Sequence, residues 1–386
     1  MPNRLHQLDA IRGLAALSVV LHHCLRIPSG LDGTLVSGLL HHTPLAVLVA
    51  GPEAVLLFFV LSGFVLSLPF FRGPVSYPQF IIKRICRIYL PYYAAVALAV
   101  VGALLTWRGG IPALGAWFNL TWTTPITPSI LAQHALLVGS FPTATLNTAI
   151  WSLVHEMRIS LIFPPIALLV VRGNWKVTLG IAASLMVVSA VVMRALPMYT
   201  GWLLSVSYTS FFIVGCLLAK HRATLAEAIA HISVRMRLGL LFSAVMLYTF
   251  KHWAPIPNSL PGDSVLSDWA ILTGASIFVI LALGSRSLSE FLKWRPIHLL
   301  GQISYSVYLL HGTLLFALVN LFYGKIPMWS IWLLTVVGTL LLSSLMYYAV
   351  EIPSINAGRY LAGRLFPSPR GRGEEAPAHP PAQPSV

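Results

Sequence analysis

The sequence predicts an all-α protein, a polytopic bundle of transmembrane helices, on three observations. The first is a shortage of charge: 57% of the 386 residues are apolar and only 9% are charged, whereas about 25% are charged in soluble proteins. The second is that apolar runs long enough to cross a membrane recur from end to end. The third is that basic residues gather on alternate connections between those runs. Together they exclude disordered chains and ordinary soluble enzymes, whose surfaces need more charge.

The apolar runs indicate about ten spans, each near the roughly 20 residues that cross a hydrocarbon layer of about 30 Å. They lie near residues 11–27, 45–69, 88–107, 149–171, 177–193, 202–219, 238–250, 267–284, 299–322 and 329–350. The run at 238–250 is the weakest of these. A short apolar piece at 130–139 has the length of a re-entrant segment.

The excess of basic residues predicts how the helices are oriented. The chain has 25 lysine and arginine residues against 11 acidic ones, a formal net charge of +14. If the N-terminus is cytoplasmic, the outer segments hold only Arg26, Arg108, Arg194, Lys251 and Lys325. Because cytoplasmic loops are enriched in lysine and arginine, we expect both termini to be cytoplasmic. The expected location is the cell's inner (plasma) membrane, with membrane lipid and no nucleic acid among the partners.

Composition also predicts the domain organisation. Residues 1–352 form the expected transmembrane domain, and residues 353–386, rich in proline, glycine and serine, form a flexible cytoplasmic tail. Residues 108–148 make the one long outer loop, which is nearly uncharged and suits a partly buried lid or a platform for a sugar. Three scattered cysteines are too few for a disulfide framework or a thiolate metal site, so no metal is expected.

Arg12 and His23 are polar residues in the first apolar span. They are eleven residues apart, close to three helical turns, so they share one helix face about 16 Å apart along the axis. A histidine at that depth can stay neutral and accept a proton. The alternative is a histidine at the outer interface, hydrogen-bonded to a carbonyl group. The residues alone favour neither the functional nor the structural interpretation.

A basic cluster of Lys83, Arg84 and Arg87 stands at the cytoplasmic end of the third span. Arg84 and Arg87 are three residues apart and share a helix face, which suits a phosphate or pyrophosphate group. The alternative is a cluster that anchors the helix to lipid headgroups, and the residues alone favour it.

A third segment places Ser152, His155 and Glu156 within two helical turns of one span. A carboxylate in a span is unfavourable enough to mark a candidate site. The alternative is a structural ion pair between Glu156 and either Arg12 or Arg158.

A fourth segment carries Ser304, Tyr308 and His311 at positions i, i+4 and i+7, a polar stripe on an apolar helix. Such stripes usually join helices, which favours a structural role for Ser304 and Tyr308 and leaves His311 open. Ser62 and Gly63 in the second span allow close helix approach and are interpreted as packing residues.

Five segments, in order, resemble the motifs of the membrane-embedded acyltransferase family 3, the integral-membrane O-acetylases of bacterial surface glycans and macrolides. The family's opening motif is an arginine followed by ten residues and a histidine, which Arg12 and His23 match. Arg84 and Arg87 match its paired-arginine motif. The other matching segments are residues 58–64, 151–156 and 303–311. The resemblance covers about residues 8–350, nearly the whole chain.

The resemblance implies a donor and a place for it. The donor is an acyl-CoA, usually acetyl-CoA, which approaches from the cytoplasm as a substrate, and no permanently bound cofactor is implied. Arg84 and Arg87, with Lys83, would hold the phosphates of CoA, which reverses the preference for headgroup anchoring.

The resemblance also implies catalytic roles. His23 would act as general base on an acceptor hydroxyl or would relay the acyl group, and Arg12 would support the site electrostatically. Glu156 would hold the histidine's tautomer or the acceptor. The expected substrate contacts are Trp151, Ser152, Tyr308 and His311.

The function expected is transfer of an acyl group to a hydroxyl of a cell-envelope or exported carbohydrate. A small-molecule natural product is an alternative acceptor. The rival class is a proton-coupled transporter or flippase that uses His23 and Glu156 as a relay, although no internal repeat is visible. The family often has a second acid after the glutamate, where this chain has Met157 and Arg158. Some relatives carry a fused esterase-like domain, so a second transfer step would need a separate extracytoplasmic transferase as partner.

Overall fold

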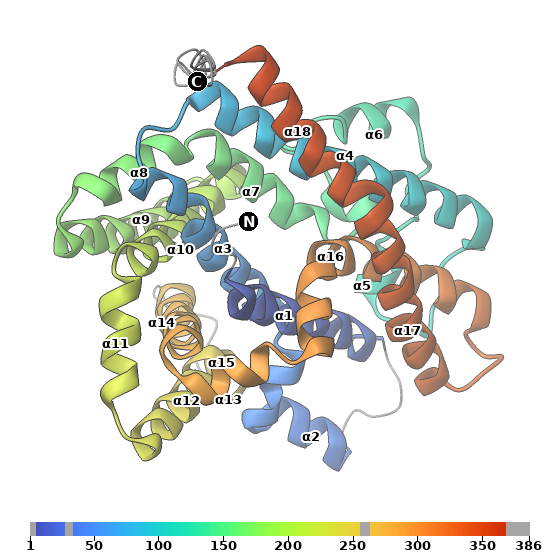
Figure 1. The fold of residues 1–386 in the computed structure, drawn as a ribbon. Coiled ribbons are helices and arrows are strands. Elements are labelled where there is room, and N and C mark those ends of the chain that lie inside the picture. The colour runs from blue at the N-terminus through green and yellow to red at the C-terminus, as the bar shows by residue number, and fades with distance from the viewer. Residues whose placement is uncertain (1–4, 28–33, 255–262, 368–386) are drawn as a thin grey trace, which may run out of the picture.

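The computed structural model describes residues 5–27, 34–254 and 263–367, and every regular element within them is helical. The helices are arranged as a bundle around a central pair, α1 (His6–Leu25) and α16 (Arg295–Phe322) (Figure 1). This confirms the predicted all-α class.

Among the described residues, eight helical segments are long and apolar enough to cross a membrane. A ninth span forms if α7 (Ile150–Leu161) and α8 (Phe163–Arg172), bent by 61°, count as one. The eight are carried by α1, α3 (Gly51–Ser67), α4 (Tyr77–Thr106), α9 (Trp175–Ala195), α10 (Thr200–Lys220), α14 (Asp263–Gly284), α16, and α17 (Met328–Met346) with α18 (Ile352–Leu365).

These eight or nine segments agree with the expected count of about ten spans. Each predicted run except the one at 238–250 falls on one of these segments. That run lies in α12 (Val234–Tyr248), whose 15 residues extend only about 22 Å at the rise of an α-helix. The apolar piece at 130–139 contributes to a short helix, α6 (Pro128–Gln133), and the turn after it.

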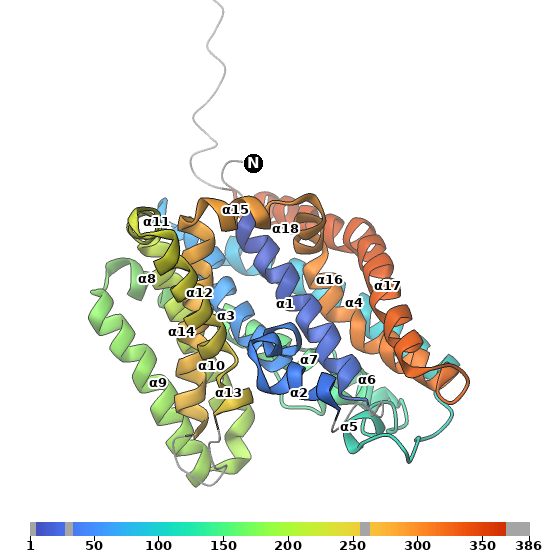
Figure 2. The same cartoon turned by 90° about the horizontal axis from the view of Figure 1, so that it is seen from below.

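Two opposite faces of the bundle differ in their connections. One, the basic face, carries α11 (Arg222–His231), α15 (Arg286–Leu292) and α18 (Figure 2). The other, the outer face, carries α2 (Leu35–His42), α5 (Ala116–Asn119), α6 and α13 (Phe250–Trp253) (Figure 2). The start of α1 and the end of α18 both lie at the basic face, which the distribution of lysine and arginine predicts to be cytoplasmic.

The boundary expected between domain and tail falls inside ordered helix. Residues 352–365 form α18, which packs along α4 (Figure 1). Pro353 is the second residue of α18 and directly follows the π-helical turn Tyr347–Glu351. The rest of the expected tail, from residue 368, lies outside the described residues.

Close backbone contact joins the central pair of helices. A Cβ atom on Gly13 would lie 2.6 Å from the backbone nitrogen of Gly301, so only glycine permits this crossing. His23 meets His311 at the same sequence offset, ten residues further along each helix. The two helices therefore run parallel in constant register. Gly63 likewise allows α3 to approach the backbone of α10 at Phe212, as its packing role predicts.

Candidate active site

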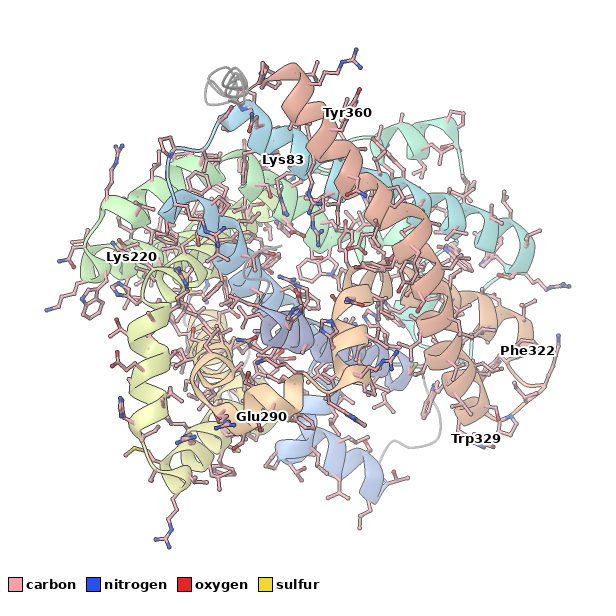
Figure 3. The ribbon with its side chains drawn as sticks, viewed as in Figure 1. Lys83, Lys220, Glu290, Phe322, Trp329 and Tyr360 are labelled. Carbon is pink, nitrogen blue, oxygen red and sulfur yellow. The ribbon has the colours of Figure 1, made fainter. Side chains whose placement is uncertain are left out.

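A cavity of about 720 Å³ lies between α1, α3, α4, α7, α16 and α18. Its lining residues come from the start of α1, the end of α3, the start of α4 and from α18, so its mouth is at the basic face. Lys83, at this mouth, lies where α4 passes α18, beside Gly358 (Figure 3). The charged side chains that line it are Asp9, Arg12, Lys83, Arg84, Arg87, Glu156, Glu351 and Arg359.

Arg84 is the most deeply held cation of the cavity and is only 8% exposed. Its guanidinium donates to Glu156 Oε1 at 2.7 Å and to Ser160 Oγ at 3.1 and 3.2 Å. Ser62 Oγ donates to the same Glu156 oxygen at 3.4 Å. A buried arginine needs such a full set of acceptors, so this network fixes the position of the guanidinium in the wall.

Arg87 is more exposed than Arg84, with 40% of its side chain accessible, and its guanidinium is 3.6 Å from Glu351 Oε1. Glu351 is 2% exposed and accepts a hydrogen bond from Ser306 Oγ at 3.1 Å. It ends a π-helical turn, Tyr347–Glu351, between α17 and α18. Such turns are often found at functional sites. Arg12 is 3.3 Å from Asp9 on the same helix.

His23 and His311 form a hydrogen-bonded pair beyond the inner end of this cavity. His23 Nδ1 and His311 Nε2 are 2.7 Å apart. His311 Nδ1 faces the carbonyl oxygens of Val307 and Tyr308 at 3.2 and 2.8 Å. A carbonyl can only accept, so Nδ1 of His311 carries a proton and its Nε2, in the neutral ring, accepts from His23. In a neutral His23 this leaves Nε2 with a lone pair, the requirement for a general base.

The outer loop covers the histidine pair. Trp117, on α5, stacks with the His23 ring, and the ring centroids are 4.9 Å apart. The His311 ring also stacks with His23 at 4.9 Å. Arg26 lies over the Trp117 ring at 4.8 Å. His311 is fully buried, while His23 remains partly accessible. The loop around Trp117 is thus partly buried, as a lid would be.

Tyr308, Ser152 and Phe58 separate the cavity from the histidine pair. The hydroxyls of Tyr308 and Ser152 are 2.7 Å apart, and Phe58 meets the Tyr308 ring edge to face at 5.5 Å. These three side chains line the cavity, whereas His23 and His311 do not. His311 follows Tyr308 by three residues, about 4.5 Å along α16. The wall between the two regions is therefore thin.

The structure brings most of the expected site residues together. Those that line the cavity are Arg12, Lys83, Arg84, Arg87, Ser152, Glu156 and Tyr308. Trp151 instead packs against His155 and Tyr208. Glu156 lies beside Arg84 and not beside His23, so it does not hold the tautomer of His23. The backbone carbonyl groups that face His311 Nδ1 have that role instead.

Arg158 belongs to a separate network at the outer loop. Its guanidinium donates to the carbonyl oxygens of Val138, Gly139 and Gly201 at 3.0, 2.7 and 2.6 Å and lies over the Trp202 ring at 3.8 Å. Neither expected ion pair of Glu156, with Arg12 or with Arg158, is therefore the one formed: the partner is Arg84.

Sequence reasoning missed Glu351 and the contribution of α18. Glu351 stands at the end of an apolar run and was indistinguishable from a boundary residue, although a carboxylate is rare in this chain, with 11 acidic residues. No group of three or more histidine, cysteine or acidic residues suited to a metal ion occurs among the described residues.

Comparison with known proteins gives one family and several distant relatives. The model of acyltransferase family 3, described as an acyltransferase domain, matches residues 5–348. Nodulation protein 10 of Rhizobium leguminosarum bv. viciae is 24% identical over 374 residues, covering 92% of this chain and 95% of the relative. No solved structure gives a significant match.

Two further relatives differ in how much of them the chain covers. Acyltransferase MdmB of Streptomyces mycarofaciens is 27% identical, with 81% of this chain and 80% of the relative aligned. The putative peptidoglycan O-acetyltransferase YrhL of Bacillus subtilis (strain 168) is 24% identical, with 93% of this chain aligned to 56% of the relative.

Proposed function

Because this chain belongs to acyltransferase family 3, an integral-membrane family, we propose that it moves an acyl group from acyl-CoA to a hydroxyl group of an acceptor. Acetyl is the proposed acyl group, and a cell-envelope or exported carbohydrate is the proposed acceptor. Membership of the family confirms the resemblance on which that expectation depended. The observation that carries the proposal is a cation-lined cavity whose inner wall lies one helical turn from a histidine pair with an available lone pair.

The donor side of the proposal is supported by charge. Five cations and three carboxylates line the cavity, so a polyanion gains more there than it loses. Arg84 and Arg87 on α4 and Arg12 on α1 all line the cavity, and guanidinium groups bind phosphate in two-point contacts. CoA enters, in this proposal, with its thioester end directed inward toward Tyr308.

The chemical step is supported by the forced tautomer of the histidine pair. The acceptor oxygen attacks the thioester carbonyl carbon, the C–O bond forms, and the C–S bond breaks. His23 Nε2 takes the hydroxyl proton and afterwards gives it to the CoA thiolate, so atoms and charge balance. While His23 is protonated, its Nδ1–H still donates to His311, whose own Nδ1–H donates to backbone carbonyls, and this chain stabilises the transient cation.

The acyl group must cross the wall formed by Tyr308, Ser152 and Phe58. Arg12 and His23 are separated by eleven residues of one helix, roughly 16 Å, which sets how far the donor's thioester end must reach. The hydrogen bond between the Tyr308 and Ser152 hydroxyls closes the direct route in this structure. We propose that rotation of Tyr308 opens it when the donor is bound.

The acceptor is proposed from the relatives and from the outer loop. One relative is named a putative peptidoglycan O-acetyltransferase and another an acyltransferase of a Streptomyces species. Trp117 places an aromatic side chain of the outer loop directly against His23. A natural product with a free hydroxyl fits the same chemistry.

The experiment is transfer of labelled acetyl from acetyl-CoA to envelope glycan in membranes that contain the wild-type protein, His23→Ala or His42→Ala. His42 is a histidine on α2 whose ring nitrogen bonds a backbone carbonyl away from the site, so it is the matched control. We expect transfer by His23→Ala to fall about 100- to 10,000-fold and transfer by His42→Ala to be unchanged. Full transfer by well-inserted His23→Ala protein contradicts the proposal, and export of labelled acetyl without ester formation favours a transporter.

A further inference from the structure

We propose that α18 forms one side of the donor entrance, where Arg359 and Lys83 bind a phosphomonoester, the 3′-phosphate of acyl-CoA. This rests on the proposed function, because it assigns one part of the proposed donor to two side chains. Neither the paired-arginine motif nor the family match, which ends at residue 348, includes Arg359.

The cations of the cavity differ in whether a carboxylate neutralises them. Arg84 pairs with Glu156 and Arg87 with Glu351, and Arg12 pairs with Asp9. Among the described residues, neither Lys83 nor Arg359 forms an ion pair with a carboxylate. Both are exposed and both line the cavity. The uncompensated positive charge of the cavity is therefore concentrated at its mouth.

Backbone packing brings these two cations to the same level of the mouth. Gly358, directly before Arg359, is buried against α4: a Cβ atom there would lie 3.0 Å from Cys86 Cβ and 3.3 Å from Lys83 Cα. Lys83 therefore lies beside the turn of α18 that carries Arg359 (Figure 3). The pair is set by contact between two rigid helices and not by a loop.

α18 is also fixed from its first residue. Glu351, immediately before the helix, is buried and contacts both Arg87 and Ser306. One turn later, Asn356 accepts a hydrogen bond from Arg359 at 3.4 Å, and both residues line the cavity. The side chain of Arg359 is thus directed along the cavity mouth by its own helix.

The chemistry of the donor selects which phosphate binds here. A phosphomonoester carries about 1.5 to 2 negative charges at pH 7 and three acceptor oxygens, more charge than either phosphate of the diphosphate linkage. The thioester must point inward to reach His23, so the nucleotide end stays at the mouth. The most highly charged group of the donor then meets the two cations that have no carboxylate partner.

A lipid phosphate at the membrane surface offers related chemistry, so the test separates the two sources. Transfer from acetyl-CoA and from 3′-dephospho-acetyl-CoA is measured for wild type, Arg359→Ala and Arg364→Ala. The assays use nanodiscs of phosphatidylcholine with and without phosphatidylglycerol. Arg364 is the matched control, because it is on the same helix, bonds Tyr360 and does not line the cavity.

We expect wild type and Arg364→Ala to prefer the 3′-phosphorylated donor in kcat/KM by about tenfold or more, a typical range for hydrogen bonds to charged groups. In Arg359→Ala the preference falls to about threefold or less, through KM and with kcat unchanged, in both kinds of nanodisc. Circular dichroism and thermal unfolding confirm that the variants fold.

Three outcomes overturn the inference. The first is an unchanged donor preference in folded Arg359→Ala, and the second is a wild type that does not distinguish the donors. The third is an effect of Arg359→Ala that appears only with phosphatidylglycerol, which would identify a lipid site. Failure of wild type to use any acyl-CoA is a different result, because it contradicts the proposed function itself.

Discussion

The arginine-lined cavity and the histidine pair keep polar groups within the bundle by opposite means. In the cavity, buried cations are balanced by carboxylates from helices distant in sequence, as in Arg84 with Glu156. In the histidine pair, two hydrogen bonds end at backbone carbonyls, and no carboxylate takes part. The first region has charge that a polyanion can displace or share, and the second has a proton acceptor whose orientation is fixed.

The comparison predicts that the two regions respond differently to loss of one partner. Removing a partner from an ion pair leaves a charge in a poorly solvated place, which mainly affects folding. Removing a partner from the histidine pair leaves the fold intact and changes which nitrogen carries the proton, which mainly affects catalysis.

The largest effect on stability is expected for Glu156→Gln. It leaves the Arg84 guanidinium, 9% exposed at the side chain, without its counter-ion. We expect a loss of about 3 kcal/mol, the lower end for a broken buried pair, because Glu156 itself keeps 21% exposure. Thermal unfolding in detergent measures it, with Glu227→Gln on exposed α11 as the control.

The double variant Arg84→Met/Glu156→Gln separates the pair from the cavity around it. Since replacing both charges removes the uncompensated ion, we expect the double variant to recover most of the lost stability. Its donor binding should be weakened, because Arg84 is gone. A double variant as unstable as Glu156→Gln would show that the pair is not the cause.

A smaller effect, on rate alone, is expected for His311→Ala. It frees His23 Nδ1 from its acceptor, so the ring can adopt the other tautomer or rotate. Acetyl transfer should fall about 100-fold with the KM for acyl-CoA unchanged, because a misplaced base affects the step and not donor binding. A rise in donor KM with an unchanged rate would contradict the separation of the two regions.

The smallest effect is expected for Tyr308→Phe, which removes one hydrogen bond from the wall between the regions. Such a bond contributes about 0.5 to 1.5 kcal/mol. If it closes the route to His23, hydrolysis of acetyl-CoA in the absence of acceptor should rise a few-fold. Ser152→Ala removes the same bond from the other side and should give the same change. Opposite effects of the two substitutions would show that the bond is not a barrier.

Particular residues show how far the sequence could be interpreted. Periodicity and charge were sufficient for the spans, and motif spacing singled out Arg12, Arg84 and Arg87, which in the structure line one cavity. Spacing could not show that Glu156 pairs with Arg84, because this contact joins helices 72 residues apart in the chain. Which helices meet depends on backbone approach and not on local pattern.

The end of the domain was misplaced for a local reason. Pro353, with small and polar residues after it, has the composition of a linker. The same small residues, Ser354, Gly358 and Ala362, recur every four positions and are buried, so they form a narrow face that fits against α4. The repeat of small residues at helical spacing indicates a packed helix, which the overall composition of the segment does not.

The glycine crossing of α1 and α16 has a mechanical consequence. The histidine contact lies ten residues beyond it on each helix, about 15 Å along the axis. A small change in the angle between the helices at the crossing therefore becomes a larger displacement at the imidazole rings. A side chain as small as a methyl group at Gly301 would force α1 and α16 apart and change the angle between them. The distance between the two histidine nitrogens beneath the outer loop therefore depends on two glycines that lie ten residues away.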